Sequence, residues 1–120
     1  MVDNKLFYIN GKWVSPKKPK EIKVINPATE EACGVISLGS KEDVNDAVIA
    51  AKNTFESWSF TPKEQRVDLL EKLYVIYKKR WADVAEAITL EMGAPKDFSS
   101  ELQTGAGAGH IKSFIKYLKE

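Results

Sequence analysis

The sequence has only one cysteine, Cys33, and only one histidine, His110, among its 120 residues. A single thiol excludes an intrachain disulfide and a metal centre built from several cysteines. A single imidazole excludes a zinc site with two or more histidine ligands. Long apolar runs are absent as well, so neither a transmembrane helix nor a signal peptide is predicted. We therefore expect a cytoplasmic chain with no membrane partner.

The sequence also has no excess of charge of either sign. Eighteen Lys and Arg residues against seventeen Asp and Glu residues give a formal net charge of +1, and 43% of the residues are apolar. A chain with so small a net charge is not expected to have the basic surface that is typical of nucleic-acid-binding proteins. The apolar content is that of a folded domain rather than a disordered chain. We predict a soluble globular protein that binds no nucleic acid.

Residues 5–38 have the alternating pattern of short strands. Two apolar runs are separated by Asn10-Gly11, and both residues tolerate the positive φ of a type I′ turn. A second pair of runs is separated by turn residues around Asn26-Pro27. The pattern predicts about four strands in two hairpins.

From residue 40 to residue 120 the apolar period becomes helical. Ser40 and Asp43 have the spacing of a capping box. Thr61 is expected to cap a second helix with Pro62 in its first turn, and Gly93 is expected to end a helix in the left-handed conformation. The stretch between these signals is long for one helix, so we expect a break near Lys79-Arg80 and a last helix from about Asp97 onward.

The apolar residues of these helices predict one buried stripe on each. In the first helix the stripe is Val44, Ala47, Val48, Ala51, Phe55 and Trp58, and in the next it runs through Leu69, Leu70, Leu73, Tyr74, Ile76 and Tyr77. Hairpins followed by three to four helices make an α+β fold, with a strand region at 5–38 and a helical region at 40–120.

Gly105, Gly107 and Gly109 alternate with alanines immediately before His110. A dinucleotide-binding loop needs the pattern G-x-G-x-x-G after a buried strand, and an acidic residue about 20 positions later. Here the sixth position is His110, the preceding residues are polar and helical, and the acidic residue has no counterpart. We interpret the stretch as a helix in which small residues allow another backbone to approach, with the close contact near Ala108 and Gly109.

Neither Cys33 nor His110 is placed for catalysis. Cys33 lies in an alternating strand rather than beside a base or at a helix N-terminus, and His110 has no second ligand at metal-binding spacing. The motifs G-x-S-x-G, H-E-x-x-H and the phosphate-binding P-loop are absent. We predict structural roles for both side chains, with no catalytic and no cofactor-binding residue in this chain.

Four segments occur in a distinctive order, and they read "YINGKWV", "VINPATEE", "SKEDVNDAVIAAKNTFESW" and "QRVDLLEKLYVIYKKRWADVAEAITLEMGAP". This series resembles the N-terminal region of the aldehyde dehydrogenase superfamily over roughly residues 8–118. The resemblance implies that residues 1–120 form the leading part of an α/β cofactor-binding domain. It also implies a complete enzyme that oxidises an aldehyde to a carboxylic acid, with a cysteine nucleophile, a glutamate base and NAD or NADP.

In such enzymes the nucleophile, the base and the cofactor-binding groups all come later in the sequence. The resemblance therefore implies that Cys33 is not the nucleophile and that this chain is inactive alone, as a truncated gene product or an excised fragment. No cofactor is expected for the chain by itself. Some members bind a structural alkali cation, and the matching positions here are the backbone carbonyl of Ile25 and the side chain of Glu91. The alternative for Glu91 is an ordinary acid at a helix end.

Two other interpretations remain open at this stage. One is a non-enzymatic interaction module whose apolar faces self-associate into a homo-oligomer or dock on a full-length relative. The other is a stand-alone nucleotide binder that uses the glycine stretch. The aldehyde itself is not encoded in this part of the sequence.

Overall fold

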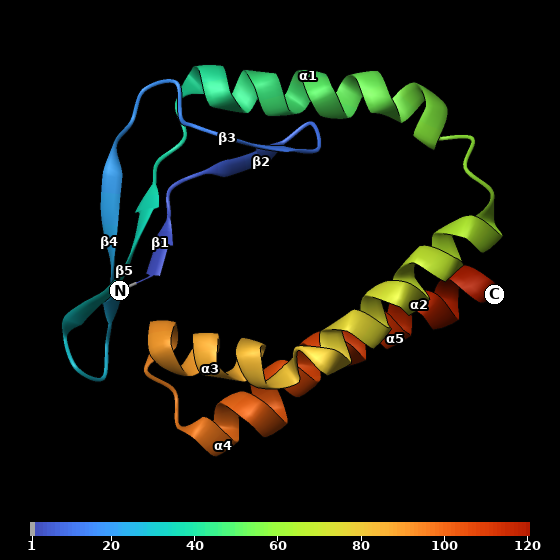
Figure 1. Cartoon of the computed structure of the whole chain (residues 1–120). Helices are drawn as coiled ribbons and strands as arrows, with labels where there is room; N and C mark the ends of the chain where they lie inside the picture. The colour runs from blue at the N-terminus through green and yellow to red at the C-terminus, as the bar shows by residue number, and fades with distance from the viewer. Residues whose placement is uncertain (1) are drawn as a thin grey trace. The chain divides into compact units, whose positions relative to one another are not determined.

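The computed structural model describes residues 2–120 and has an α+β fold, as predicted. The elements in chain order are β1 Val2–Asn4, β2 Phe7–Ile9, β3 Lys12–Val14, β4 Glu21–Asn26, β5 Glu31–Ser37, α1 Lys41–Trp58, α2 Lys63–Lys79, α3 Trp81–Met92, α4 Lys96–Phe98, a π-helical segment Ser99–Gln103 and α5 Thr104–Lys119 (Figure 1). They form two compact units. The first contains the strands and α1, up to Phe60, and the second contains Pro27–Thr29 and Thr61–Glu120.

The first unit contains both predicted hairpins. β2 and β3 pair antiparallel through a turn in which Asn10 has φ 52° and Gly11 has φ 74°, the conformation expected of a type I′ turn. β4 and β5 pair antiparallel across the second turn. β1 adds to the other side of β5 in parallel, giving the order β1-β5-β4. This fifth strand was not predicted, because residues 2–4 lie before the predicted strand region and pair in parallel with a strand about 30 residues later rather than across a hairpin turn.

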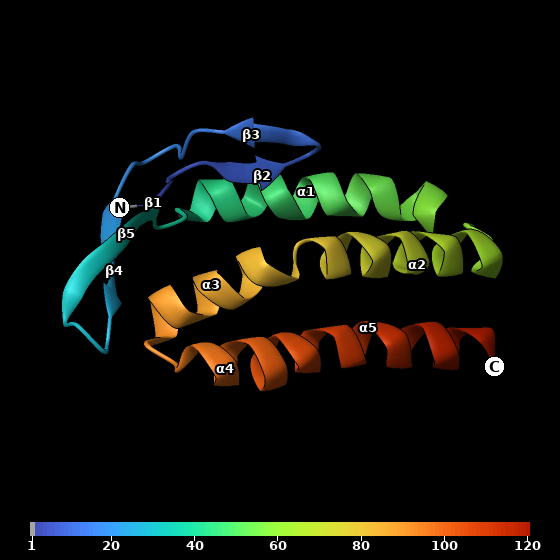
Figure 2. The same cartoon turned by 60° about the horizontal axis from the view of Figure 1, so that its bottom comes forward.

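The second unit is built on α2 and α5, which run antiparallel (Figure 2). The hydroxyl of Tyr77, near the end of α2, donates to the carbonyl of Thr104 at the start of α5, and Lys63 near the start of α2 donates to the carbonyl of Lys119. Buried and half-buried residues of α5 recur at alternating steps of four and three, which is the spacing of a seam between packed helices. They are Thr104, Ala108, Ile111, Ile115 and Leu118, and α2 presents Val67, Leu70, Tyr74 and Tyr77.

Two predicted interruptions of the helices are confirmed. α2 ends at Lys79 and α3 begins at Trp81, with Arg80 between them at φ −100° and ψ 20°. Gly93 follows α3 in the left-handed conformation, with φ 67°. A side chain at that φ crowds the following carbonyl, which is why glycine ends this helix.

The predicted cap of α2 by Thr61 is wrong. Pro62 is the residue at the N-cap, with ψ 146°, and no side chain caps the helix. The carbonyl of Pro62 accepts the first hydrogen bond of the helix from Arg66 at 3.2 Å. Because Pro62 is extended rather than helical, α2 starts one residue later than the sequence signal indicated.

The predicted single buried stripe on each helix is also wrong. In α1, Val44, Val48 and Phe55 are 56%, 58% and 67% exposed, and Asp43 and Ala50 are the residues of the helix that are not exposed. The space between the helix and the β2–β3 hairpin is an open hollow rather than a packed contact. In α2 the apolar residues divide into two stripes. One packs on α5, and the other, Leu69, Leu73 and Ile76, is about half exposed.

Candidate functional site

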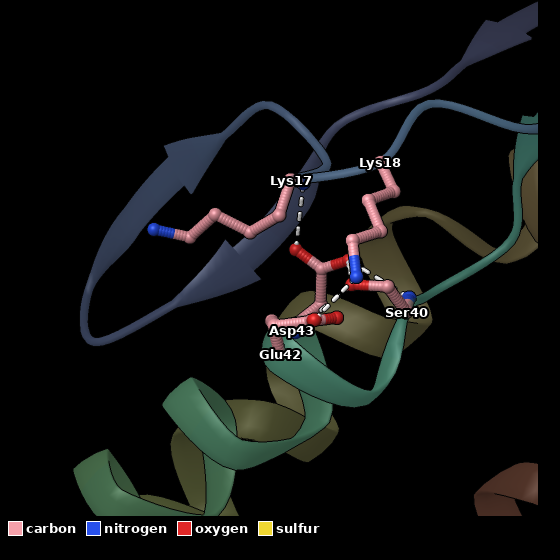
Figure 3. Close-up of polar contacts among 5 residues, drawn as sticks. All are labelled: Lys17, Lys18, Ser40, Glu42 and Asp43. Carbon is pink, nitrogen blue, oxygen red and sulfur yellow. Dashed lines mark hydrogen bonds and ion pairs between the residues drawn. The ribbon is translucent and has the colours of Figure 1, made fainter.

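The most connected polar group of the first unit is the carboxylate of Asp43 at the start of α1 (Figure 3). It accepts hydrogen bonds from the backbone N–H of Lys17 at 2.9 Å, the N–H of Ser40 at 2.8 Å and the Ser40 hydroxyl at 2.7 Å. The Ser40 oxygen in turn accepts from the N–H of Asp43 at 3.3 Å. This confirms the predicted capping box.

The Asp43 cluster also fixes the loop between β3 and β4 to α1. Hydrogen bonds from Ser40 and from the Lys17 backbone hold the pKa of the Asp43 carboxyl below its ordinary value. Beside it, Lys18 pairs with Glu42 and lowers the pKa of that carboxyl, and Lys17 pairs with Asp46 at 3.3 Å. Both oxygens of the Asp43 carboxylate accept hydrogen bonds from the protein itself. The cluster is therefore a structural anchor and not an acid–base pair.

An open hollow of about 420 Å³ lies between the β2–β3 hairpin and α1. Its lining is largely apolar and aromatic, with Tyr8, Ala47, Ala51, Phe55 and Trp58 among the residues that face it. It has no carboxylate, histidine, cysteine or lysine in its wall. The hollow lacks the groups that general acid–base or nucleophilic catalysis requires.

The glycine stretch lies within a helix, so the structure does not support a nucleotide loop. Ser99–Gln103 is π-helical, and the carbonyl of Ser99 accepts both the N–H of Thr104 and its hydroxyl, the latter at 2.8 Å. The hydroxyl of Ser99 accepts from Thr89 of α3 at 2.8 Å. Ser99 and Thr104 are fully buried. The widened turn thus keeps its buried polar groups satisfied.

The close approach predicted near Gly109 occurs instead at Gly107. A Cβ added at Gly107 would stand 2.3 Å from the Tyr77 hydroxyl oxygen, whereas one added at Gly105 or Gly109 would meet nothing within 4 Å. Ala108 is buried in the seam, as expected. The predicted contact with a backbone is therefore corrected to a contact with the Tyr77 side chain. The spacing of the small residues could not indicate which glycine makes the close contact, because that depends on the side of α5 that the Tyr77 side chain reaches.

Cys33 and His110 lie apart from any catalytic arrangement. Val24 is opposite Gly34 and Ile25 is opposite Ala32, so Cys33 is the extra residue of a β-bulge. Its thiol donates to the carbonyl of Val24 at 3.4 Å. His110 is exposed on α5.

The proposed cation ligands belong to different units. Ile25 lies in β4 and Glu91 lies in α3, where its side chain is exposed. Among residues 2–120, no three His, Cys, Asp or Glu side chains come together in a way that could hold a metal ion. Two oxygen groups are fewer than hard cations usually take. The pair therefore stays a prediction.

If the predicted pair binds an alkali cation, KCl or NaCl should raise the melting temperature relative to choline chloride at equal ionic strength. Glu91→Gln should remove the difference by removing a carboxylate ligand. Differential scanning calorimetry measures both effects. Equal melting temperatures in all three salts would contradict the site.

The structure over residues 2–120 has no helix that is both long and apolar enough to cross a membrane. Exposed apolar side chains occur on α1, α2 and α5.

Residues 13–120 match the model of the aldehyde dehydrogenase family. The chain is 46% identical over its whole length to 3-succinoylsemialdehyde-pyridine dehydrogenase of a Pseudomonas species, of which it covers 25%. It superposes on an aldehyde dehydrogenase of Bartonella henselae with a TM-score of 0.97 and 47% identity, covering 99% of this chain and 25% of that one. Aldehyde dehydrogenase C of Pseudomonas syringae, solved as a mutant with NAD+ and octanal, matches with a TM-score of 0.92 and 35% identity over 98% of this chain and 24% of that one.

The chain therefore belongs to the aldehyde dehydrogenase family. It spans about a quarter of the length of the relatives it matches, and the matching part is their N-terminal portion. The sequence resemblance is confirmed.

Proposed function

We propose that this chain serves as the N-terminal quarter of an enzyme that oxidises aldehydes to carboxylic acids with NAD+. The observation that supports this most directly is the match to aldehyde dehydrogenase C, whose structure contains NAD+ and octanal. The match to a semialdehyde dehydrogenase at 46% identity has the same implication. Within the larger enzyme, this segment would act as a scaffold next to the catalytic parts.

The chemistry of the chain's own residues supports a scaffold role. The thiol of Cys33 is hydrogen-bonded to the backbone within a bulge, and the Asp43 carboxylate is held by backbone and hydroxyl donors. Neither group is free to attack an aldehyde or to activate water. The nucleophile and the base would come from outside residues 1–120.

A chimera tests the proposed function. The first quarter of unmutated aldehyde dehydrogenase C of Pseudomonas syringae is replaced by this chain, and NADH formation from NAD+ and octanal is followed by absorbance. We expect an active dehydrogenase, because the two segments superpose with a TM-score of 0.92. A folded but inactive chimera, beside an active parent enzyme, would contradict the proposal.

The purified chain alone should form no NADH from NAD+ and octanal, because the Cys33 thiol is hydrogen-bonded within a β-bulge and the Asp43 carboxylate is held by donors of its own fold. The Cys33→Ser variant is the matched control and should behave identically. Aldehyde-dependent NADH formation that disappears in Cys33→Ser would show that the chain carries its own nucleophile, and would overturn the scaffold role.

A further inference from the structure

The turn of the β2–β3 hairpin contains a reactive pair, Asn10-Gly11. The sequence has five asparagines, and Asn10 is the only one that glycine follows. The side-chain amide carbon of an asparagine can form a five-membered ring with the backbone nitrogen of the next residue. A side chain on that next residue hinders the ring closure, and glycine has none. The chemistry is therefore favoured at Asn10 over the other four asparagines, Asn4, Asn26, Asn45 and Asn53.

The nitrogen that would close the ring is accessible. Asn10 and Gly11 are both exposed, and a Cβ added at Gly11 would meet nothing within 4 Å. Ile9 and Lys12 are the last pair of the β2–β3 ladder. In a two-residue turn the residues that flank the turn carry the closing hydrogen bonds, so the N–H of Gly11 is outside the ladder. Water and hydroxide can therefore reach this N–H and remove its proton.

The hairpin can also open far enough for the ring to form. Asn10 has φ 52° in the closed turn, and ring closure requires rotation about its Cα–C and Cα–Cβ bonds. β2 and β3 form a separate two-stranded sheet with three residues in each strand, and a sheet of this size is marginally stable by itself. The space beside the turn, between the hairpin and α1, is an open hollow. Local opening of the turn therefore supplies the rotation.

We propose that Asn10 is a site of spontaneous deamidation. The deprotonated backbone nitrogen of Gly11 attacks the amide carbon of Asn10, and the side-chain nitrogen leaves as ammonia, which gives a cyclic imide. One water molecule then adds to either carbonyl of the imide and breaks the bond from that carbon to nitrogen. Opening at the side-chain carbonyl gives aspartate, and opening at the main-chain carbonyl gives isoaspartate. Water is the only co-reactant, and no group is oxidised or reduced.

The two products have different consequences for the hairpin. Aspartate tolerates a positive φ as asparagine does, so the aspartyl form keeps the type I′ turn and adds a carboxylate to the wall of the hollow. Isoaspartate carries the main chain through its own side chain, which adds one backbone atom to the turn. The pairing of Ile9 with Lys12 then no longer fits a two-residue turn. The contact between Tyr8 and Trp13, whose ring centroids are 5.2 Å apart, is lost with it.

Peptide mapping tests the proposal, and it does so without NAD+ or an aldehyde, so the result is independent of the proposed function. The purified chain is incubated at neutral and at mildly alkaline pH, and the peptide that contains residue 10 is followed by mass spectrometry. We expect the amide to become a carboxyl, faster at the higher pH because the attacking nitrogen must lose its proton. Enzymatic methylation specific for isoaspartate should label the product. Asn26 is the internal control and should stay unchanged, because the nitrogen of Pro27 has no proton to lose.

Gly11→Asp is the matched variant. Aspartate tolerates the positive φ of this position, whereas its side chain crowds the attacking nitrogen. Conversion should slow at least about tenfold, which corresponds to about 1.4 kcal/mol in the barrier. Gly11→Asn replaces this variant if circular dichroism shows that it does not fold. Equal rates in the unmodified chain and the folded variant would overturn the proposal, as would an amide at Asn10 that stays intact. Aspartate without isoaspartate would also overturn it, because direct hydrolysis of the side chain gives aspartate only.

A spectroscopic measurement separates the two products. The signal of interest is the part of the near-ultraviolet circular dichroism that Trp13→Leu removes. We expect Asn10→Asp to keep this signal and the purified isoaspartyl chain to lose it. A signal of equal size in both chains would contradict the proposed effect of isoaspartate on the hairpin.

Discussion

Gly107→Leu is expected to destabilise the second unit by about 1–3 kcal/mol relative to Gly109→Leu. Both changes replace a helical glycine with a better helix former, so the gain from helix propensity, about 1 kcal/mol, cancels in the comparison. At position 107 the new Cβ would stand 2.3 Å from the Tyr77 hydroxyl, and at position 109 it would meet nothing within 4 Å. Thermal and urea unfolding followed by circular dichroism measure the difference.

Movement of the Tyr77 side chain would relieve the clash only by giving up contacts that this side chain makes. Its hydroxyl donates to the Thr104 carbonyl at 3.1 Å, and its ring meets Trp81 edge-on with centroids 6.2 Å apart. In a Tyr77→Ala background the difference between the two leucine variants should shrink, since the obstructing atoms are gone. Equal stability of Gly107→Leu and Gly109→Leu in the unmodified background would show that α2 and α5 are not packed as described.

Asp43→Ala is expected to lower the stability of the first unit more than Ser40→Ala does. Ser40→Ala removes one cap, which costs about 1 kcal/mol. Asp43→Ala leaves three donors without their acceptor, including the N–H of Lys17, which holds the β3–β4 loop to α1. Hydrogen exchange measured segment by segment should show faster exchange in both the loop and the first turn of α1. Faster exchange in the turn alone would contradict the anchoring role.

The same carboxylate predicts a dependence on pH. The native pKa of Asp43 lies below its unfolded value of about 3.9. A depressed native pKa means that the carboxylate stabilises the folded state above pH 4 and that this contribution is lost as the pH falls through the native pKa. The thermal unfolding midpoint of the unmodified chain should therefore fall as the pH is lowered below 4. The unfolding midpoint of Asp43→Asn should fall less steeply over the same pH range. Parallel pH profiles would contradict the assignment.

Local signals in the sequence were reliable where a few adjacent residues determine the backbone. Asn10-Gly11, the Ser40–Asp43 box and Gly93 each specify a turn or a helix end by their own conformational preferences, and all three were predicted. Burial was not predictable in the same way. The apolar spacing of Val44, Val48 and Phe55 predicts a buried stripe, but the spacing within one helix cannot show whether another element packs on that side, and these side chains are exposed.

The functional interpretation came from the order of several motifs rather than from any one residue. Physical tests on the glycines favoured a helix over a nucleotide loop, and the glycines do lie in α5. They misplaced the close contact, because the identity of the approaching group depends on how α2 and α5 face each other. The Ile25–Glu91 cation pair could not be judged from either hairpin or helix patterns, since its two members lie in separate units.

The short strand β1 has a consequence for how the protein is handled. Val2 lies beside Gly34 and Asn4 beside Ile36, so three residues cover part of one side of β5. Without them, the N–H and C=O groups of that side would be open, and such an edge is a template for strands of other molecules. The beginning of the chain thus protects the sheet against intermolecular strand addition. Affinity tags are better attached beyond Glu120 than exchanged for residues 2–4.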